Sequence, residues 1–266
     1  MKKIVLALIH NNNKERYSYI RSHLDLLKKD LTSWETEIVE VSKQPEIVPS
    51  KTMITLVRKF LLWKINREWI RYKLLKPRNI ILDTGILFWR LVGIVVYGEL
   101  EKRRLVIDSF VTDKHIRALS YFLDKDADLL ICFEDDAVFK KDSLSRLKIL
   151  LKEVEKQGKS PLYMDLAGGC SLEVLKVSRL ETKKDKDRRY YKKPVTNSGC
   201  CYMINSKTAE LFMLAILRYP CLRLIPYDWL MNKLFILTSN YKYNCFHYWP
   251  HIFEHGSSLG DYKSWL

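Results

Sequence analysis

The chain has 266 residues, of which 47% are hydrophobic and 29% are charged. This composition supports a buried core and excludes a wholly disordered protein. Lys and Arg outnumber Asp and Glu by 46 to 31, so the formal net charge is +15. A surplus of this size favours a polyanionic partner, which could be nucleic acid, an anionic membrane surface or a phosphorylated substrate. We expect a single domain over residues 1–266.

The first forty residues predict a strand, a helix and a second strand. The apolar run Ile4–Ile9 is typical of a strand covered on both faces. Asparagines follow it without a small-residue cleavage pattern, so we expect a buried strand rather than a signal peptide. Residues 14–29 place apolar and aromatic side chains at helical spacing, and Thr36–Val41 alternates as strands do. The chain therefore opens as an α/β fold.

A strongly basic segment follows. Residues 51–78 contain nine Lys or Arg and one acid, Glu68, and we expect a basic helical insertion over 51–104. Ile80–Tyr97 is apolar but contains Arg90, which disfavours a membrane-spanning helix. We expect the insertion to contact an anionic membrane surface or to pack on the domain. An ordinary helix with snorkelling Lys and Arg side chains is the structural alternative.

The second half of the chain alternates helical and strand patterns. Apolar periodicity predicts helices over 111–123, 142–157, 206–217 and 226–236, and strands over 129–133 and 162–166. Residues 176–193 contain nine Lys or Arg and three acids with little periodicity, which predicts a charged loop. The residues from Tyr241 onward are predicted to be rich in turns.

The strongest chemical feature lies at the end of the strand predicted over 129–133. There the apolar run continues directly into Glu134, Asp135 and Asp136. Three like charges at one point repel one another unless a cation or basic groups neutralise them. Carboxylate oxygens at a strand end suit Mg²⁺ or Mn²⁺, and ligands of open α/β sheets bind at that edge. An acidic turn with a capping Asp is the alternative.

Short motifs around this cluster carry a family resemblance. His10-Asn11 and Arg16 follow the first strand, and Lys114–Leu119 places a His before Ala-Leu. Ser198–Ala209 has a Gly before a Tyr-containing strand, and Pro226–Trp229 contains Pro-x-Asp. In this order the motifs resemble metal-dependent glycosyltransferases with the GT-A fold, and glycosyltransferase family 25, the lipooligosaccharide galactosyltransferases, in particular.

The resemblance covers three blocks, residues 3–27, 109–140 and 194–258. It departs from the family at Phe110–Asp113, where the family has Gly-Glu-x-Gly, and that puts a donor contact from this turn in doubt. It implies a GT-A-like, Rossmann-type mixed sheet flanked by helices. It also implies transfer of a hexose, galactose being one candidate, from a nucleotide-sugar donor, usually a UDP-hexose, to a glycolipid or oligosaccharide.

The resemblance and the residue chemistry together suggest roles for the acids. We expect Asp136 and Glu134 to hold Mn²⁺ or Mg²⁺, and His255 to be the late histidine that completes the metal shell in GT-A enzymes. Asp228 is the candidate base that deprotonates the acceptor hydroxyl, with inversion at the sugar carbon. An acid stabilised by the start of a helix is the alternative for Asp228, and a hydrogen-bonded structural histidine is the alternative for His255.

Donor contacts are expected from two parts of the chain. Near the acidic strand end these are His10, Asn11, Arg16, Glu134 and Asp135. In the charged loop they are Lys184 and Arg188, because loops of this kind close over the donor in GT-A enzymes. Packing and solvated surface positions are the structural alternatives for these basic residues.

The cysteines and the missing nucleic-acid motifs bear on cellular compartment and on alternative functions. The six cysteines form no CxxC pair, so we expect free thiols in a reducing cytosol. We expect no zinc site, because adjacent Cys200 and Cys201 cannot easily face one ion. Zinc-finger, RNA-recognition and helix-turn-helix signatures are lacking, so we expect no nucleic-acid partner. A metal-dependent nuclease or nucleotidyltransferase would need further acids, of which Asp165 is the obvious one. The expected location is cytoplasmic, peripheral on the inner face of the cell membrane.

Overall fold

The first strands of the sheet are parallel. A computed structural model describes residues 2–42, 88, 98–156, 160–167, 181–185, 188–191, 195–196 and 198–260. In it, β1 (Lys2–Ile9) pairs in parallel with both β2 (Trp34–Val41) and β3 (Leu129–Glu134). Helix α1 (Lys14–Asp30) joins β1 to β2, as predicted. The carboxyl ends of β1 and β3 therefore lie side by side.

The other half of the sheet is mixed. β8 (Cys201–Asn205) is antiparallel to β3 and to β5 (Leu162–Ala167), and β5 is parallel to β9 (Asn244–Tyr248). A hairpin of β6 (Glu181–Asp185) and β7 (Arg188–Tyr191) adds to β9. Within the described residues, the eight strands follow the order β2-β1-β3-β8-β5-β9-β7-β6. The predicted mixed α/β sheet of Rossmann type is thus confirmed.

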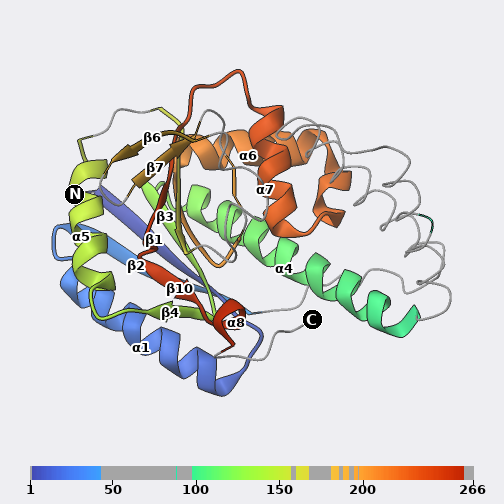
Figure 1. The fold of residues 1–266 in the computed structure, drawn as a ribbon, viewed down its shortest axis with the longest axis horizontal. Helices are drawn as coiled ribbons and strands as arrows, with labels where there is room; N and C mark the ends of the chain where they lie inside the picture. Colours follow the sequence, from blue (N-terminus) through green and yellow to red (C-terminus); the bar gives the residue numbers. More distant parts are fainter. Residues whose placement is uncertain are drawn as a thin grey trace.

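Helices cover both faces of this sheet (Figure 1). On one face lie α1 and α5 (Ser143–Val154); on the other lie α4 (Gly98–Asp124), α6 (Ser206–Arg218) and α7 (Tyr227–Leu237), with the 3-10 helix η2 (Pro220–Leu224) between the last two. In β1, Ile4, Leu6 and Leu8 pack towards α1 and α5, while the intervening residues pack towards α4. Both faces are buried, which explains the continuous apolar run in the sequence.

A small second sheet joins the end of the described chain to the acidic strand end. After β9 come β10 (Phe253–His255) and the short helix α8 (Gly256–Leu259). β10 is antiparallel to β4 (Ala137–Phe139), which follows β3 after a two-residue turn. The pairing places His255 opposite Ala137 and so beside the acidic turn.

Two sequence predictions are corrected by the structure. The helix predicted over 111–123 begins earlier, at Gly98, so residues 98–104 belong to α4 rather than to a separate insertion. The charged loop predicted over 176–193 contains the β6–β7 hairpin. Long Lys and Arg stems can cover apolar surface while their charges stay in water, so a strand can form there without apolar alternation.

The basic segment 51–78, on which the membrane expectation rests, lies outside the described residues. Among the residues that are described, no helix is both long enough and apolar enough to cross a membrane.

Candidate active site

The candidate site lies where β3 ends, in the turn that carries Asp135 and Asp136. The β4–β10 pairing closes over this turn, and the Gly256 N–H donates to the Asp136 carbonyl oxygen at 2.9 Å. This backbone contact brings His255, distant in the sequence, next to Asp136. The carboxyl ends of β1 and β3 lie next to this turn, and ligands of open α/β sheets bind at such strand ends.

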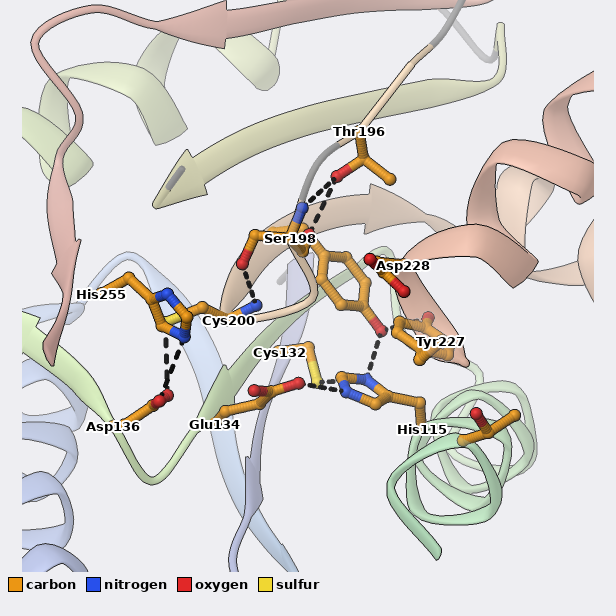
Figure 2. Close-up of polar contacts among 12 residues, drawn as sticks. His115, Cys132, Glu134, Asp136, Thr196, Ser198, Cys200, Tyr227, Asp228 and His255 are labelled. Carbon is orange, nitrogen blue, oxygen red and sulfur yellow. Dashed lines mark hydrogen bonds and ion pairs between the residues drawn. The ribbon is translucent and has the colours of Figure 1, made fainter. Parts of the chain in front are cut away.

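Asp136 is the centre of a compact polar cluster (Figure 2). Its Oδ2 lies 3.1 Å from His255 Nε2 and accepts a hydrogen bond from the Ser257 hydroxyl at 2.6 Å. Its Oδ1 accepts a hydrogen bond from the Cys200 thiol at 3.6 Å. The other ring nitrogen of His255, Nδ1, is hydrogen-bonded to Ser258 Oγ. The donor atoms of Asp136, Cys200 and His255 all lie within 4.8 Å of one another.

The charges of this cluster support each other. Burial alone would raise the pKa of Asp136, but the hydrogen bond and positive charge of His255 outweigh burial and lower that pKa below 3.8. Burial alone would lower the pKa of His255, but Asp136 outweighs it and raises that pKa above 6.5. Asp136 and His255 therefore favour each other's charged form, and a divalent cation could take the place of the His255 proton.

Glu134 does not join this cluster, contrary to the expectation that it is a metal ligand. Its Oε1 lies 2.8 Å from His115 Nε2, and His115 is fully buried. The ring of His115 stacks on Tyr227 with centroids 3.6 Å apart, and its Nδ1 lies 3.2 Å from the Tyr202 hydroxyl. This buried partner fixes the Glu134 carboxylate, which remains 24% exposed and faces the strand end. Glu134 therefore lies outside the group of possible metal ligands and keeps a partly exposed carboxylate at the strand end.

Gly199 makes this close packing possible. A Cβ atom at this position would lie 3.0 Å from Glu134 Oε1 and 3.0 Å from Tyr227 Cδ1. A side chain at this position would therefore displace Glu134 or Tyr227 by a few tenths of an ångström, which accounts for the Gly in the Ser198–Ala209 motif.

Asp135 turns away from the cluster into the protein. Its Oδ2 accepts a hydrogen bond from the Asn11 N–H at 3.1 Å, and its Oδ1 lies 3.7 Å from Arg16 NH1. Burial raises the pKa of Asp135 to about 6. Arg16 is 4% exposed, so its guanidinium packs against Asp135 rather than projecting toward a donor. The alternative for Arg16, a solvated position on the helix surface, is also wrong because its side chain is buried.

The loop after β1 is held by a residue that sequence reasoning did not single out. Lys114 is completely buried; its Nζ donates to the His10 carbonyl at 2.7 Å and to Asn11 Oδ1. Burial lowers the pKa of Lys114 to about 8. His10 itself is buried, with its ring 4.9 Å from that of Tyr17. Asn11 remains partly exposed, so it can still contact a donor.

Asp228, the candidate base, lies in the first turn of α7. Its Oδ1 accepts a hydrogen bond from the Trp229 N–H at 2.8 Å, which is the contact expected of a carboxylate at a helix N-terminus. Figure 2 shows it beside Tyr227, at the opposite side of the view from Asp136 and His255, with Glu134 between them. The structural alternative is therefore present, and Asp228 still borders the site.

The two basic residues expected to close over the donor are in the β6–β7 hairpin. Arg188 forms an ion pair with Glu153 of α5, and its guanidinium lies 5.3 Å from the centre of the Phe246 ring. It therefore ties the hairpin to the domain. Lys184 pairs with Arg189 in the strand register, and its side chain is outside the described part of the structure.

A second acid–histidine pair lies deeper in the sheet. Asp165 of β5 and His247 of β9 are 0% and 1% exposed, and Asp165 Oδ2 lies 3.3 Å from His247 Nδ1. His247 Nε2 donates to the Val195 carbonyl at 2.6 Å, and the Thr196 hydroxyl donates to Asp165 Oδ2 at 3.3 Å. These contacts tie down the segment that leads to Gly199.

Comparison with known proteins adds no family assignment to this geometry. No protein-family model matches the chain, and no curated protein matches it. Chemically, the site offers a carboxylate, an imidazole and a thiol at one point, with a further carboxylate, Glu134, facing the same strand end. Such a set can bind a divalent cation beside a ligand.

Proposed function

We propose that the protein is a metal-dependent glycosyltransferase. It would transfer a hexose, with galactose as one candidate, from a nucleotide-sugar donor such as a UDP-hexose to a lipooligosaccharide or other glycan acceptor. One observation carries the proposal: the fold brings Asp136 and His255 within 3.1 Å at the carboxyl ends of parallel strands. A diphosphate beyond those strand ends would lie where open α/β sheets bind ligands, next to the only cluster of metal-ligating groups among the described residues.

The residues fit a resident divalent cation. Asp136 offers carboxylate oxygens and His255 offers Nε2, while Ser258 at Nδ1 holds the imidazole orientation as partners of metal-bound histidines do. A bound cation would supply neutralisation of the charge that develops on the diphosphate leaving group. The sequence suggested Mn²⁺ or Mg²⁺ for this role.

The chain's own residues account for the rest of the proposed reaction. Glu134, oriented by His115, faces the strand end and would accept hydrogen bonds from sugar hydroxyls. Asn11 would contact the donor from the loop after β1. Asp228 would take the proton of the acceptor hydroxyl, and direct displacement would invert the configuration at the sugar carbon.

The acceptor class motivates a membrane location. A glycolipid acceptor, a net charge of +15 and the basic segment 51–78 together support peripheral contact with the anionic inner face of the cell membrane. Sedimentation with phosphatidylglycerol vesicles at low salt should carry the protein into the pellet, and phosphatidylcholine vesicles should not. Equal sedimentation with both would contradict this part of the proposal.

The main alternative is a metal-dependent nuclease or nucleotidyltransferase. A two-metal site needs further carboxylates around the ions, and Asp165 was the obvious candidate. Asp165 is 0% exposed and faces His247, so it does not reach the Asp136 cluster as an additional open ligand. This placement favours glycosyl transfer over two-metal chemistry on nucleic acid.

The deciding experiment is a screen of nucleotide sugars for hydrolysis in the presence of Mn²⁺. We expect one UDP-hexose to be consumed by the native protein and not by Asp136→Ala. Asp142→Ala is the matched control, because Asp142 precedes α5 without a side-chain cap hydrogen bond and should keep full activity. UDP with Mn²⁺ at 100 times Kd should also stabilise the fold by about 2.7 kcal/mol. Stabilisation by oligonucleotides instead, with steep salt dependence, would support the alternative.

A further inference from the structure

The Asp136 cluster contains a ligand atom that glycosyl transfer with Mn²⁺ or Mg²⁺ does not call for. Cys200 is fully buried, and its thiol donates to Asp136 Oδ1 at 3.6 Å. Its sulfur, an Asp136 oxygen and a His255 nitrogen lie within 4.8 Å of one another. The site therefore combines oxygen, nitrogen and sulfur donors.

The backbone holds Cys200 in this position from both sides. The Cys200 N–H donates to Ser198 Oγ at 3.0 Å, and the Cys200 carbonyl accepts a hydrogen bond from the Glu134 N–H at 2.8 Å. The second contact links the residue before β8 directly to the end of β3. The thiol is thus fixed beside the acidic turn by the same backbone that builds the sheet.

The spacing of these atoms suits a tetrahedral ion. Zn²⁺ binds sulfur at about 2.3 Å and nitrogen or oxygen at about 2.0–2.2 Å, so neighbouring ligand atoms lie roughly 3.2–3.8 Å apart. Cys200 Sγ lies 3.6 Å from Asp136 Oδ1, and His255 Nε2 lies 3.1 Å from the other carboxylate oxygen, Oδ2, which is slightly closer than two ligands of one ion. A small outward movement of the imidazole would bring the three ligand atoms to tetrahedral spacing. Three protein ligands leave a fourth position open to a water or a ligand oxygen, as in catalytic zinc sites.

The types of ligand atom indicate which ion the site prefers. Thiolates favour Zn²⁺ and related soft ions, whereas Mg²⁺ and Mn²⁺ favour oxygen ligands. A coordinated thiol loses its proton, so one thiolate and one carboxylate balance the two charges of the ion. The argument against zinc from adjacent cysteines does not apply, because this site uses Cys200 alone and the Cys201 thiol lies outside the group.

We propose that Asp136, Cys200 and His255 form a zinc-type site in which Cys200 selects Zn²⁺ over Mn²⁺ and Mg²⁺. The catalytic use of that ion rests on the proposed function, but its binding does not. Binding is therefore tested without turnover.

The test is titration of the metal-free protein with Co²⁺, which substitutes for Zn²⁺ and reports its ligands by absorption. We expect a sulfur-to-cobalt charge-transfer band in the near ultraviolet and its removal when Zn²⁺ is added. Cys200→Ser should abolish the band and weaken Zn²⁺ binding by at least about 10-fold, since even outer partners of metal ligands contribute 10- to 100-fold. Mn²⁺ binding should change much less.

Cys201→Ser is the matched control, because Cys201 is equally buried and adjacent but outside the group, and it should keep the band. Circular dichroism checks that each variant folds. If Cys200→Ser does not fold, loss of the band in Asp136→Ala places the thiolate-bound ion at this cluster. A cobalt complex without the band, a band that survives in folded Cys200→Ser, or tighter binding of Mn²⁺ than Zn²⁺ would overturn the proposal.

The two proposals fail separately. A charge-transfer band that depends on Cys200, without consumption of any nucleotide sugar, would leave the zinc site standing and refute glycosyl transfer. Donor consumption that depends on Asp136 and is unchanged in Cys200→Ser, without the band, would do the opposite.

Discussion

Two acid–histidine pairs in the same sheet, one after β3 and one on β5 and β9, contain the same residue types and have pKa shifts in opposite directions. Asp136 and His255 lie 3.1 Å apart with side chains 7% and 20% exposed. Asp165 and His247 lie 3.3 Å apart with side chains 0% and 1% exposed. In the first pair the pKa of Asp136 is lowered and that of His255 is raised, so each charge favours the other. In the second pair burial raises the pKa of Asp165 to about 6 and lowers that of His247 to about 4, so burial disfavours both charges.

The contrast shows that access to water and hydrogen-bond donors, rather than residue type, decides which pair can serve a reaction. Asp136 receives hydrogen bonds from Ser257 and Cys200 as well as facing His255, so its charge is stabilised. His247 donates its Nε2 proton to a carbonyl, so the lone pair on Nδ1 faces Asp165 and favours a proton on the acid. The open pair is suited to a cation and the buried pair to structure.

The largest expected effect is on activity and concerns the open pair. Asp136→Asn keeps the shape of the side chain but removes its charge, and metal ions contribute several kcal/mol to such reactions. We expect hydrolysis of the donor sugar nucleotide to fall by about 10³-fold, measured as kcat/KM. Asp165→Asn is the matched substitution in the buried pair and should stay within about threefold of the native rate. Similar losses in both variants would erase the functional distinction between the pairs.

The next effect is on stability and concerns the buried pair. His247→Ala removes the hydrogen bond to the Val195 carbonyl and leaves Asp165 without its partner. An unsatisfied buried hydrogen-bonding group costs about 1–3 kcal/mol, and the missing imidazole also leaves a cavity. Urea denaturation should show a loss of about 3 kcal/mol for His247→Ala and less than about 1 kcal/mol for His255→Ala. Equal losses would show that the open pair is structural too.

A smaller effect of opposite sign is expected for Asp165→Asn. A carboxyl whose pKa is raised in the folded state stabilises the fold below pH 3.8, and this contribution is lost as pH rises through about 6. The shift corresponds to at most about 3 kcal/mol. At pH 8 the variant should therefore unfold at higher urea concentration than the native protein, and near pH 4 the two should coincide. A destabilised variant at pH 8 would show that the buried Asp165 carboxylate does not cost the native fold stability at that pH.

The smallest effect is the pH dependence of the metal-free open pair. The pKa of His255 is raised in the fold, so its stabilising contribution is present below pH 6.5 and is lost as pH rises through the folded pKa. For a partly exposed pair we expect about 0.5–1 kcal/mol. The melting temperature of the chelator-treated protein should fall slightly between pH 6 and 8, and His255→Gln should flatten this slope. A steeper slope in His255→Gln would assign the effect to another group.

Much of the fold was predictable because its signals are local. The apolar run of β1, the helical spacing of α1 and the periodicity of α6 and α7 depend only on neighbours in the chain. The β6–β7 hairpin was missed because Arg188 and its charged neighbours carry no alternation. The true start of α4 was missed because its first turns fall in a segment that composition had marked as an insertion.

The site was predictable in its members and less so in its partners. Asp136 and His255 were both identified, since a carboxylate cluster and a late histidine are visible in the sequence. That Glu134 pairs with His115, and that Cys200 faces Asp136, depends on strand register and on close packing at Gly199. Such contacts between distant positions leave no periodic trace.

The β4–β10 pairing would make ion binding at the proposed site depend on a contact between distant parts of the chain. Most strands of the sheet lie between Asp136 and His255 in the sequence. Until β4 and β10 pair, His255 is not held next to Asp136, and the three possible metal ligands are not assembled. An unfolded chain would therefore hold the ion weakly, and each bound ion would mark a chain that has completed its fold. If the proposed site holds an ion, chelation should lower the apparent melting temperature, and a newly made chain should bind the ion only after β10 has paired with β4.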